Sequence, residues 1–207
     1  MLPVSLVVTN FGYSNINTDE ARITTVNDGL VTLTSSLTLE AMPQSELRPI
    51  FEEFNPSKNE LIGKCYITLY EKGDGKVLFD VGSGIDFLTG MGSLKGSLEI
   101  ISINLEDMAS VIFTHANPDH ILSVPDDFDD LNFPYADYHI ARIECEYCWD
   151  PDTGNKVDES RVATAVGARR RLEALEEYIN LLDDGEEPIF GILTKLTPRY
   201  PLGHMSF

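Results

Sequence analysis

Apolar and polar positions alternate over much of the N-terminal part of the chain, which is the pattern of half-buried strands. Residues 22–27 and 30–39 are rich in Val, Ile, Leu and Thr, and Asp28-Gly29 between them predicts a tight β-hairpin. A second hairpin is predicted over 65–79, where the turn sequence Lys-Gly-Asp-Gly occupies 72–75. This part of the chain is therefore expected to be built from hairpins.

Helical spacing of apolar residues appears at several places along the chain. Short helices are predicted at 44–54, 94–101 and 105–109. The clearest prediction is a helix over 158–182, which ends at an Asp-Asp-Gly sequence. Its apolar residues recur at helical spacing and form a stripe made of Val162, Val166, Leu172, Leu175, Ile179 and Leu182. We expect this stripe to pack on a sheet.

Three further apolar runs, at 111–113, 138–143 and 189–196, are predicted as strands because they are short and rich in β-branched or aromatic residues. Polar residues follow the first of these runs directly. The order strand, helix, strand and polar loop indicates a β-rich α/β fold whose functional side chains lie at strand ends.

Composition and charge make some classes of function unfavourable for this chain. The 207 residues suit a single domain, 1–207, with a sizeable core. Lys and Arg number 15 against 34 Asp and Glu, and the net charge of −19 disfavours binding to nucleic acid or to an anionic membrane. The basic run 169–171 is followed by glutamates and is interpreted as a solvated helix face. No apolar run is long enough to span a bilayer, and residues 2–8 lack the features of a signal peptide, so a cytoplasmic protein is expected.

The three cysteines are too few for a disulfide framework. Cys145 and Cys148 have C-x-x-C spacing, but no second pair completes a zinc site, and no helix start is predicted there to favour a redox motif. Together with Cys65, they are interpreted as incidental. The acidic run 126–130 is interpreted as a solvated loop, since its spacing does not suit a calcium loop.

The strongest chemical signal follows the predicted strand 111–113. His115, Asp119 and His120 are good ligands for zinc, and the loop leaving a strand can turn several side chains toward one point. The alternative is a polar Asn-Pro-Asp turn with two histidines beside it. Spacing alone does not decide between these interpretations.

The segment 114–120, T-H-A-N-P-D-H, resembles the T-H-x-H-x-D-H signature of the metallo-β-lactamase fold superfamily, with Asn117 where the family has its second histidine. Residues 78–82, L-F-D-V-G, resemble the L-x-D-x-G segment that buttresses the metal loop in that family. The segment 133–136 with Glu144 and Trp149 is similar to a pattern in the branch that includes methyl parathion hydrolase-like and lactonase-like enzymes.

The C-terminal stretch departs from the family pattern. Aligned without gaps, Tyr200 occupies the position of a metal-binding histidine, and His204 matches the second, non-ligand histidine. A shifted alignment would instead make His204 the ligand. An amide at Asn117 and a phenol at Tyr200 are poor zinc ligands beside imidazole.

The resemblance implies that the metal ligands are His115, Asp119 and His120, which in the family do not all serve one metal, and that Asp119 also orients the nucleophile. The implied fold is an α/β metallo-β-lactamase-like αβ/βα sandwich whose second half is incomplete, so that a second copy in a homo-oligomer could cover the exposed sheet face.

The implied activity is hydrolysis of a small-molecule ester, lactone or phosphotriester by a zinc-bound hydroxide. A catalytically impaired homologue or binding protein that keeps the fold but not the dinuclear zinc site is the alternative. A structural acidic interaction domain is a third possibility, although it leaves the histidine loop unexplained.

Overall fold

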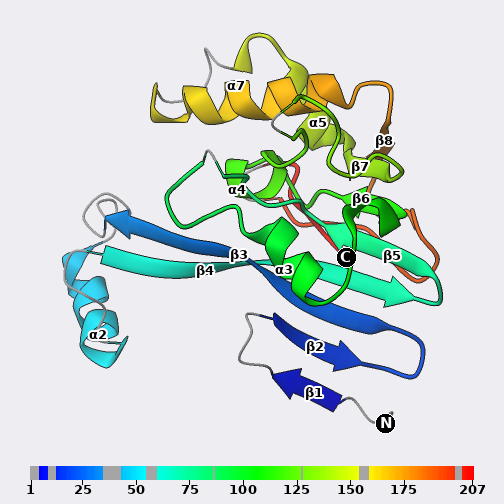
Figure 1. Ribbon diagram of the computed structural model, residues 1–207. Coiled ribbons are helices and arrows are strands. Elements are labelled where there is room, and N and C mark those ends of the chain that lie inside the picture. Colours follow the sequence, from blue (N-terminus) through cyan, green and yellow to red (C-terminus); the bar gives the residue numbers. More distant parts are fainter. Residues whose placement is uncertain are drawn as a thin grey trace.

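The computed structural model describes residues 5–8, 13–34, 43–54, 60–85, 87–126, 128–153, 159–198 and 202–207. Within these residues one sheet has eight strands, paired in the same order as they follow along the chain (Figure 1). The pairings among the first five strands are antiparallel, and the three pairings β5–β6, β6–β7 and β7–β8 are parallel. The strands are β1 (Ser5–Val8), β2 (Tyr13–Asn17), β3 (Arg22–Thr34), β4 (Glu60–Lys72), β5 (Gly75–Phe79), β6 (Ser110–Ile112), β7 (Asp137–Ala141) and β8 (Ile179–Leu182).

Helices lie beside the parallel strands, against β3 and at the far end of the long β3–β4 pair. In Figure 1 β3 and β4 extend away from the other strands toward α2, while α5 and α7 lie together beside β7 and β8. The helices are α2 (Gln44–Phe54), α3 (Leu94–Ile100), the 3-10 turn η1 (Leu105–Asp107), α4 (Pro118–Ile121), α5 (Arg142–Trp149) and α7 (Glu159–Ala174), and two short strands, β9 (Lys195–Leu196) and β10 (Met205–Ser206), pair with each other. None of the described helices is long and apolar enough to cross a membrane.

Both faces of the parallel strands bury apolar side chains, because neighbouring residues of a strand point to opposite faces. Leu78 and Val111 pack into the larger core, which includes residues of α3, α5 and α7. Val77 and Ile112 point the other way, into a smaller cluster that includes Met205 of β10. Strands buried on both faces read as continuous apolar runs, which explains why β6 was recognisable from three residues.

Several predicted elements are confirmed. The helix at 44–54 is α2, the helix at 94–101 is α3, and the second hairpin is formed by β4 and β5. The run 111–113 lies on β6 and its end, and 105–109 contains the single turn η1.

The first predicted hairpin is wrong. Asp28-Gly29 does not turn the chain, because β3 runs without interruption from Arg22 to Thr34 along β4, with a register shift between Asn27 and Gly29. The Asp28 side chain is fully buried, and it accepts hydrogen bonds from Ser83 and from the Leu94 amide at the start of α3. Residues 35–39 of the predicted second strand lie outside the described residues. The Asp-Gly pair therefore forms a β-bulge that docks on the loop after β5.

The long C-terminal helix is also wrong in its second half. Helix α7 ends at Ala174, and 179–182 form β8, which pairs in parallel with β7. Val166 of the expected apolar stripe is 59% exposed. The residues Ile-Asn-Leu-Leu fit both a helical and a strand spacing, and the pairing with β7 decides between them.

Two smaller corrections concern strand ends. The strand predicted at 138–143 stops at Ala141, and α5 begins at Arg142, so Cys145 and Cys148 lie on a helix that the sequence did not indicate. Of the strand predicted at 189–196, only Lys195–Leu196 is a strand, and Ile189 and Ile192 form an isolated bridge.

Candidate functional site

The candidate site lies where the parallel strands β5, β6 and β7 end. Asp80 follows β5, the loop 113–117 follows β6, and Glu144 lies in the first turn of α5 after β7. Because parallel strands end at the same edge of a sheet, these three segments meet there. The edge therefore brings together residues that are far apart in the sequence.

Asp80 is the centre of a hydrogen-bond network at this edge. One carboxylate oxygen, Oδ1, accepts from the Thr114 amide at 2.8 Å, and the other, Oδ2, accepts from the Thr114 hydroxyl at 2.8 Å. Oδ2 also lies 2.8 Å from Nδ1 of His120. Asp80 is buried and has a φ of 64°, a left-handed conformation that aspartate tolerates better than most residues. The L-x-D-x-G segment thus contacts the histidine loop as the sequence predicted.

This network fixes the tautomer of His115. The Thr114 hydroxyl donates its only proton to Asp80, so it must accept a hydrogen bond from Nδ1 of His115, which is 2.9 Å away. Burial, together with the nearby charge of His120, lowers the pKa of His115 to about 4. His115 is therefore neutral near pH 7, with its proton on Nδ1 and a lone pair on Nε2.

His120 is held between two carboxylates. Its Nδ1 faces Asp80, and its Nε2 lies 3.3 Å from Oδ2 of Asp119. Burial by itself would lower the pKa of His120, but the hydrogen bonds with Asp119 and Asp80 raise it to about 10. Burial likewise opposes ionisation of Asp119, yet the hydrogen bond from His120 leaves the pKa of Asp119 below its ordinary value. The pair is thus an imidazolium and a carboxylate when no metal is bound.

The donor set fits a zinc ion in part. Two ligands of one tetrahedral zinc ion lie about 3.3 Å apart, which is the separation of His120 Nε2 and Asp119 Oδ2. The Asp80–His120 contact is also the kind of carboxylate–histidine pair that orients a metal-binding imidazole. Within the described part of the chain, however, no three His, Cys, Asp or Glu side chains form a group that could hold one ion. The ligand assignment to His115, Asp119 and His120 therefore stays a prediction.

A third histidine that was not assigned to the site lies beside the first two. The ring centroids of His115 and His120 are 4.0 Å apart, and those of His115 and His204 are 5.1 Å apart. Nδ1 of His204 is 2.9 Å from the Thr197 hydroxyl. The proximity of His204 could not be read from its spacing, since more than eighty residues separate it from His115. Only the family alignment placed it near the site, as the non-ligand histidine when aligned without gaps and as a ligand in the shifted alignment.

Glu144 links these two histidine segments. Its side chain is 2% exposed, and its two oxygens accept hydrogen bonds from the amides of Ala116 at 3.0 Å and Gly203 at 3.1 Å. Burial raises the pKa of Glu144, while the two amide hydrogen bonds act against this increase. The sequence singled out Glu144 only as part of a branch pattern, without a contact.

The structure describes only one of the two residues that stand where the family has metal-binding histidines. Asn117 precedes α4, and its side chain makes no capping hydrogen bond. Tyr200 lies outside the described residues. His139 lies in β7 with Nδ1 buried.

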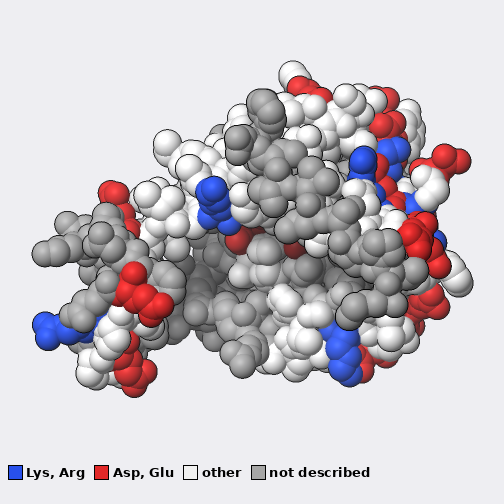
Figure 2. Space-filling model, turned by 90° about the horizontal axis from the view of Figure 1, so that it is seen from below, with Lys and Arg blue, Asp and Glu red and all other residues white. Residues whose placement is uncertain are grey.

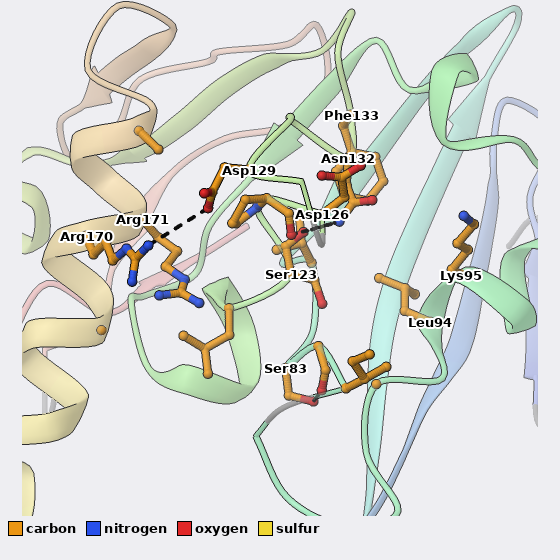
Figure 3. Close-up of a pocket in the computed structure, with 18 of the residues that line it drawn as sticks. Ser83, Leu94, Lys95, Ser123, Asp126, Asp129, Asn132, Phe133, Arg170 and Arg171 are labelled. Carbon is orange, nitrogen blue, oxygen red and sulfur yellow. Dashed lines mark hydrogen bonds and ion pairs between the residues drawn. The ribbon is translucent and has the colours of Figure 1, made fainter.

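A cavity of about 900 Å³ lies beside α4, between α3 and α7 (Figure 3). Neither histidine of the loop nor Asp119 lines it. Arg170 and Arg171 border it from α7, and Lys95 borders it from α3. The expected pairing within the basic run holds for Arg169, which contacts Glu173 at 2.7 Å, whereas its two neighbours turn toward the cavity.

The cysteines form no site among the described residues. Cys145 and Cys148 are free and buried in α5, and Cys65 is free and partly buried. Burial raises the pKa of Cys145 to about 12 and also raises that of Cys148. Such thiols are not nucleophilic near neutral pH, which agrees with their interpretation as incidental.

A search of curated proteins found no match. Among solved structures, AidC, a dizinc quorum-quenching lactonase in complex with a product, has a TM-score of 0.83 at 21% identity, over 94% of this chain and 69% of that chain. The hydrolase AbOPH, of the beta lactamase superfamily, has a TM-score of 0.83 at 21% identity, over 94% and 68%. A probable metal-dependent hydrolase from Staphylococcus aureus has a TM-score of 0.73 at 16% identity, over 90% and 67%.

These structural similarities establish the fold, and a family model that is matched by sequence identifies the superfamily. The model of the metallo-beta-lactamase superfamily matches residues 62–207, which include β4, the Asp80 segment, the histidine loop and the Gly203 segment. The chain has the mixed α/β architecture of these neighbours, with its polar cluster at the ends of the parallel strands. The chain therefore belongs to the metallo-beta-lactamase superfamily.

Proposed function

We propose that this chain is a metal-dependent hydrolase that acts on small esters, lactones or phosphotriesters. The observation that carries the proposal is the pair formed by Asp119 and His120, whose 3.3 Å separation suits two ligands of one zinc ion. Two of the structural neighbours, a dizinc lactonase and a hydrolase, support a hydrolytic reaction.

In this proposal Asp119 and His120 would hold the ion, and His115 would offer Nε2 beside them. A bound zinc ion supplies Lewis acidity and lowers the pKa of a water molecule. The protein orients these groups: Asp80 fixes the His120 ring through Nδ1, and Thr114 fixes the His115 tautomer. Asp119 is the proposed catalytic residue, because its carboxylate can accept a hydrogen bond from the attacking water and so orient it.

Hydrolysis of a panel of lactones, aryl esters and aryl phosphotriesters tests the proposal. We expect turnover that a chelator abolishes and zinc restores. Asp119→Asn should lower kcat/KM by about 100-fold or more, because the catalytic carboxylate is lost. Asp152→Asn, at an exposed position, is the matched control and should leave kcat/KM unchanged. Turnover that survives chelation, or an Asp119→Asn variant as active as the control, would contradict the proposal.

A second candidate is a catalytically impaired relative that keeps the fold and binds a ligand. The observation that favours it is the lack of a three-ligand metal group within the described part of the chain. Zinc analysis separates the two candidates. If the second candidate is correct, the protein holds clearly less than two zinc equivalents per chain. The double substitution Asn117→His with Tyr200→His should then increase zinc binding. Two tightly bound zinc ions in the unmodified chain would refute this second candidate.

A further inference from the structure

The carboxylate of Glu144 joins two segments that are distant in sequence. Oε1 accepts from the amide of Ala116, directly after His115, and Oε2 accepts from the amide of Gly203, directly before His204. His115 and His204 are thus each adjacent in sequence to a residue whose backbone amide donates a hydrogen bond to Glu144. With Glu144 2% exposed, neither hydrogen bond is open to competition from bulk water.

The Gly203 segment is shaped to approach Glu144 closely. A Cβ atom at position 203 would lie 2.4 Å from Cβ of Glu144 and 2.5 Å from its backbone nitrogen, so no larger residue fits without moving the backbone. A third hydrogen bond, from the Met205 amide to the Thr114 carbonyl at 2.9 Å, continues the same contact. The two segments are therefore fitted to each other over several residues, with Glu144 between them.

The contact places two imidazoles side by side, each with Nδ1 next to a threonine hydroxyl. Nδ1 of His115 is 2.9 Å from the Thr114 hydroxyl, and Nδ1 of His204 is 2.9 Å from the Thr197 hydroxyl. Within the described part of the chain, the Nε2 atom of neither ring forms a hydrogen bond. Both rings are anchored at one nitrogen and have the other available to a ligand.

We propose that Glu144 is a positioning residue of the candidate site, which holds His204 against His115 so that the Nε2 atoms of both rings serve one bound ligand. The ligand is a small molecule with a hydroxyl group, such as the hydroxy acid formed by hydrolysis of a lactone, because Nε2 of His115 carries a lone pair and can only accept a hydrogen bond. The identity of this ligand rests on the proposed function. The clamp, by which we mean the two hydrogen bonds from the amides of Ala116 and Gly203 to Glu144, rests on the geometry alone.

The test uses NMR of the full 207-residue chain, with chelator present, because ring resonances report the arrangement without any turnover. Glu144→Gln keeps the size of the side chain but replaces one acceptor oxygen by a donor, so it can bind only one of the two amides. We expect loss of the NOE between the His115 and His204 rings and shifts of both ring resonances. The His139 resonance, on β7, should stay in place and show that the sheet is intact. Glu146→Gln, at an exposed position of the same helix, is the matched control and should change neither ring.

Gly203→Ala tests the clamp from its other side, because the added Cβ forces the segment away while the carboxylate is retained. It should change the same two ring resonances as Glu144→Gln. If either variant lowers the melting temperature but leaves the ring contact in place, Glu144 has only a structural role and the proposal is wrong. If both variants fail to fold, amide exchange in the unmodified protein decides. Amides of Ala116 and Gly203 that exchange at least about 100-fold more slowly than unstructured ones support the clamp, and unprotected amides overturn it.

A functional measurement completes the test. If the unmodified protein hydrolyses a substrate, Glu144→Gln should lower kcat/KM by about tenfold or more, as loss of an orienting contact does, and Glu146→Gln should not. Unchanged kcat/KM in a variant whose ring contact is lost would overturn the assignment of His204 to the site. Absence of hydrolysis in the unmodified protein would refute the proposed function. Titration with 4-hydroxybutyrate, observed at the His115 and His204 rings, would then decide whether the clamped pair binds a hydroxy acid: shifts of both ring resonances would support the proposal, and unchanged resonances would overturn it.

Discussion

Asp80 is the residue on which the arrangement of the loop histidines depends. A single buried carboxylate anchors the backbone and hydroxyl of Thr114 and one nitrogen of His120. Since Thr114 in turn fixes His115, one side chain orients both neighbouring imidazoles. Burial without a carboxylate partner keeps His115 neutral, and direct contact with two carboxylates keeps His120 charged.

The opposite protonation states can be measured by NMR of the metal-free protein. At pH of about 7.5 we expect the His120 ring to be protonated and the His115 ring to be neutral with its proton on Nδ1. The pKa of His120 is raised, so its contribution to folding stability is complete below its ordinary value of 6.5 and is lost as the pH rises through about 10. The pKa of His115 is lowered, so its contribution is complete above 6.5 and is lost as the pH falls toward about 4. Equal titration of both rings near 6.5 would contradict this account.

At the scale of elements, the bulge in β3 is what couples the antiparallel and parallel parts of the sheet to the site. Asp28 projects from the bulge to Ser83 and to the amide of Leu94 at the start of α3. The loop that contains Ser83 begins at Asp80, which holds the histidine loop. The bulge therefore supports the site through two successive sets of hydrogen bonds, the first to Asp28 and the second to Asp80.

Substitution of Gly29 tests the bulge. This glycine has a φ of 140°, and a Cβ there would lie 2.2 Å from the Gly90 carbonyl oxygen. Gly29→Ala should lower the free energy of unfolding by about 2–3 kcal/mol, from backbone strain and from the clash. The matched control is Gly96→Ala in α3, where a Cβ meets nothing within 4 Å. This control should raise the free energy of unfolding by about 0.5–1 kcal/mol. Denaturant unfolding measures both, and an unaffected Gly29→Ala variant would show that the bulge is not tightly docked.

At the scale of the whole molecule, negative charge dominates the surface. Figure 2 shows acidic side chains toward both ends of one face, with Lys and Arg side chains both among them and between the two ends. The net charge is −19, so the folded state carries unfavourable repulsion between like charges. Long-range repulsion of this kind is screened by salt more strongly than are the buried contacts of the site.

Raising the ionic strength should therefore stabilise the protein. Between about 10 mM and about 150 mM sodium chloride we expect the melting temperature to rise by about 2–4 °C, which corresponds to about 1 kcal/mol for a chain of this size. Thermal unfolding followed by circular dichroism measures the change. A melting temperature that falls with salt would show instead that favourable ion pairs outweigh the repulsion.

The sequence by itself determined the elements and residues whose signals are local. A short apolar run identified β6, and the turn sequence Lys-Gly-Asp-Gly identified the β4–β5 hairpin. The His, Asp and His residues after β6 identified the loop at the candidate site. The family resemblance also connected the L-x-D-x-G segment with that loop, and Asp80 makes this contact. These inferences succeed because strand propensity, turn residues and side-chain chemistry act over a few neighbouring residues.

Only the tertiary structure decided what depends on contacts between distant residues. Asp28-Gly29 has the local signal of a hairpin, but the partners of its buried carboxylate lie at 83 and 94, and these make it a bulge. Residues 179–182 fit a helix as well as a strand until β7 pairs with them. The contact of His204 with His115 through Glu144 spans three segments of the chain. No local pattern encodes such contacts, because their free energy exists only once the segments have been brought together.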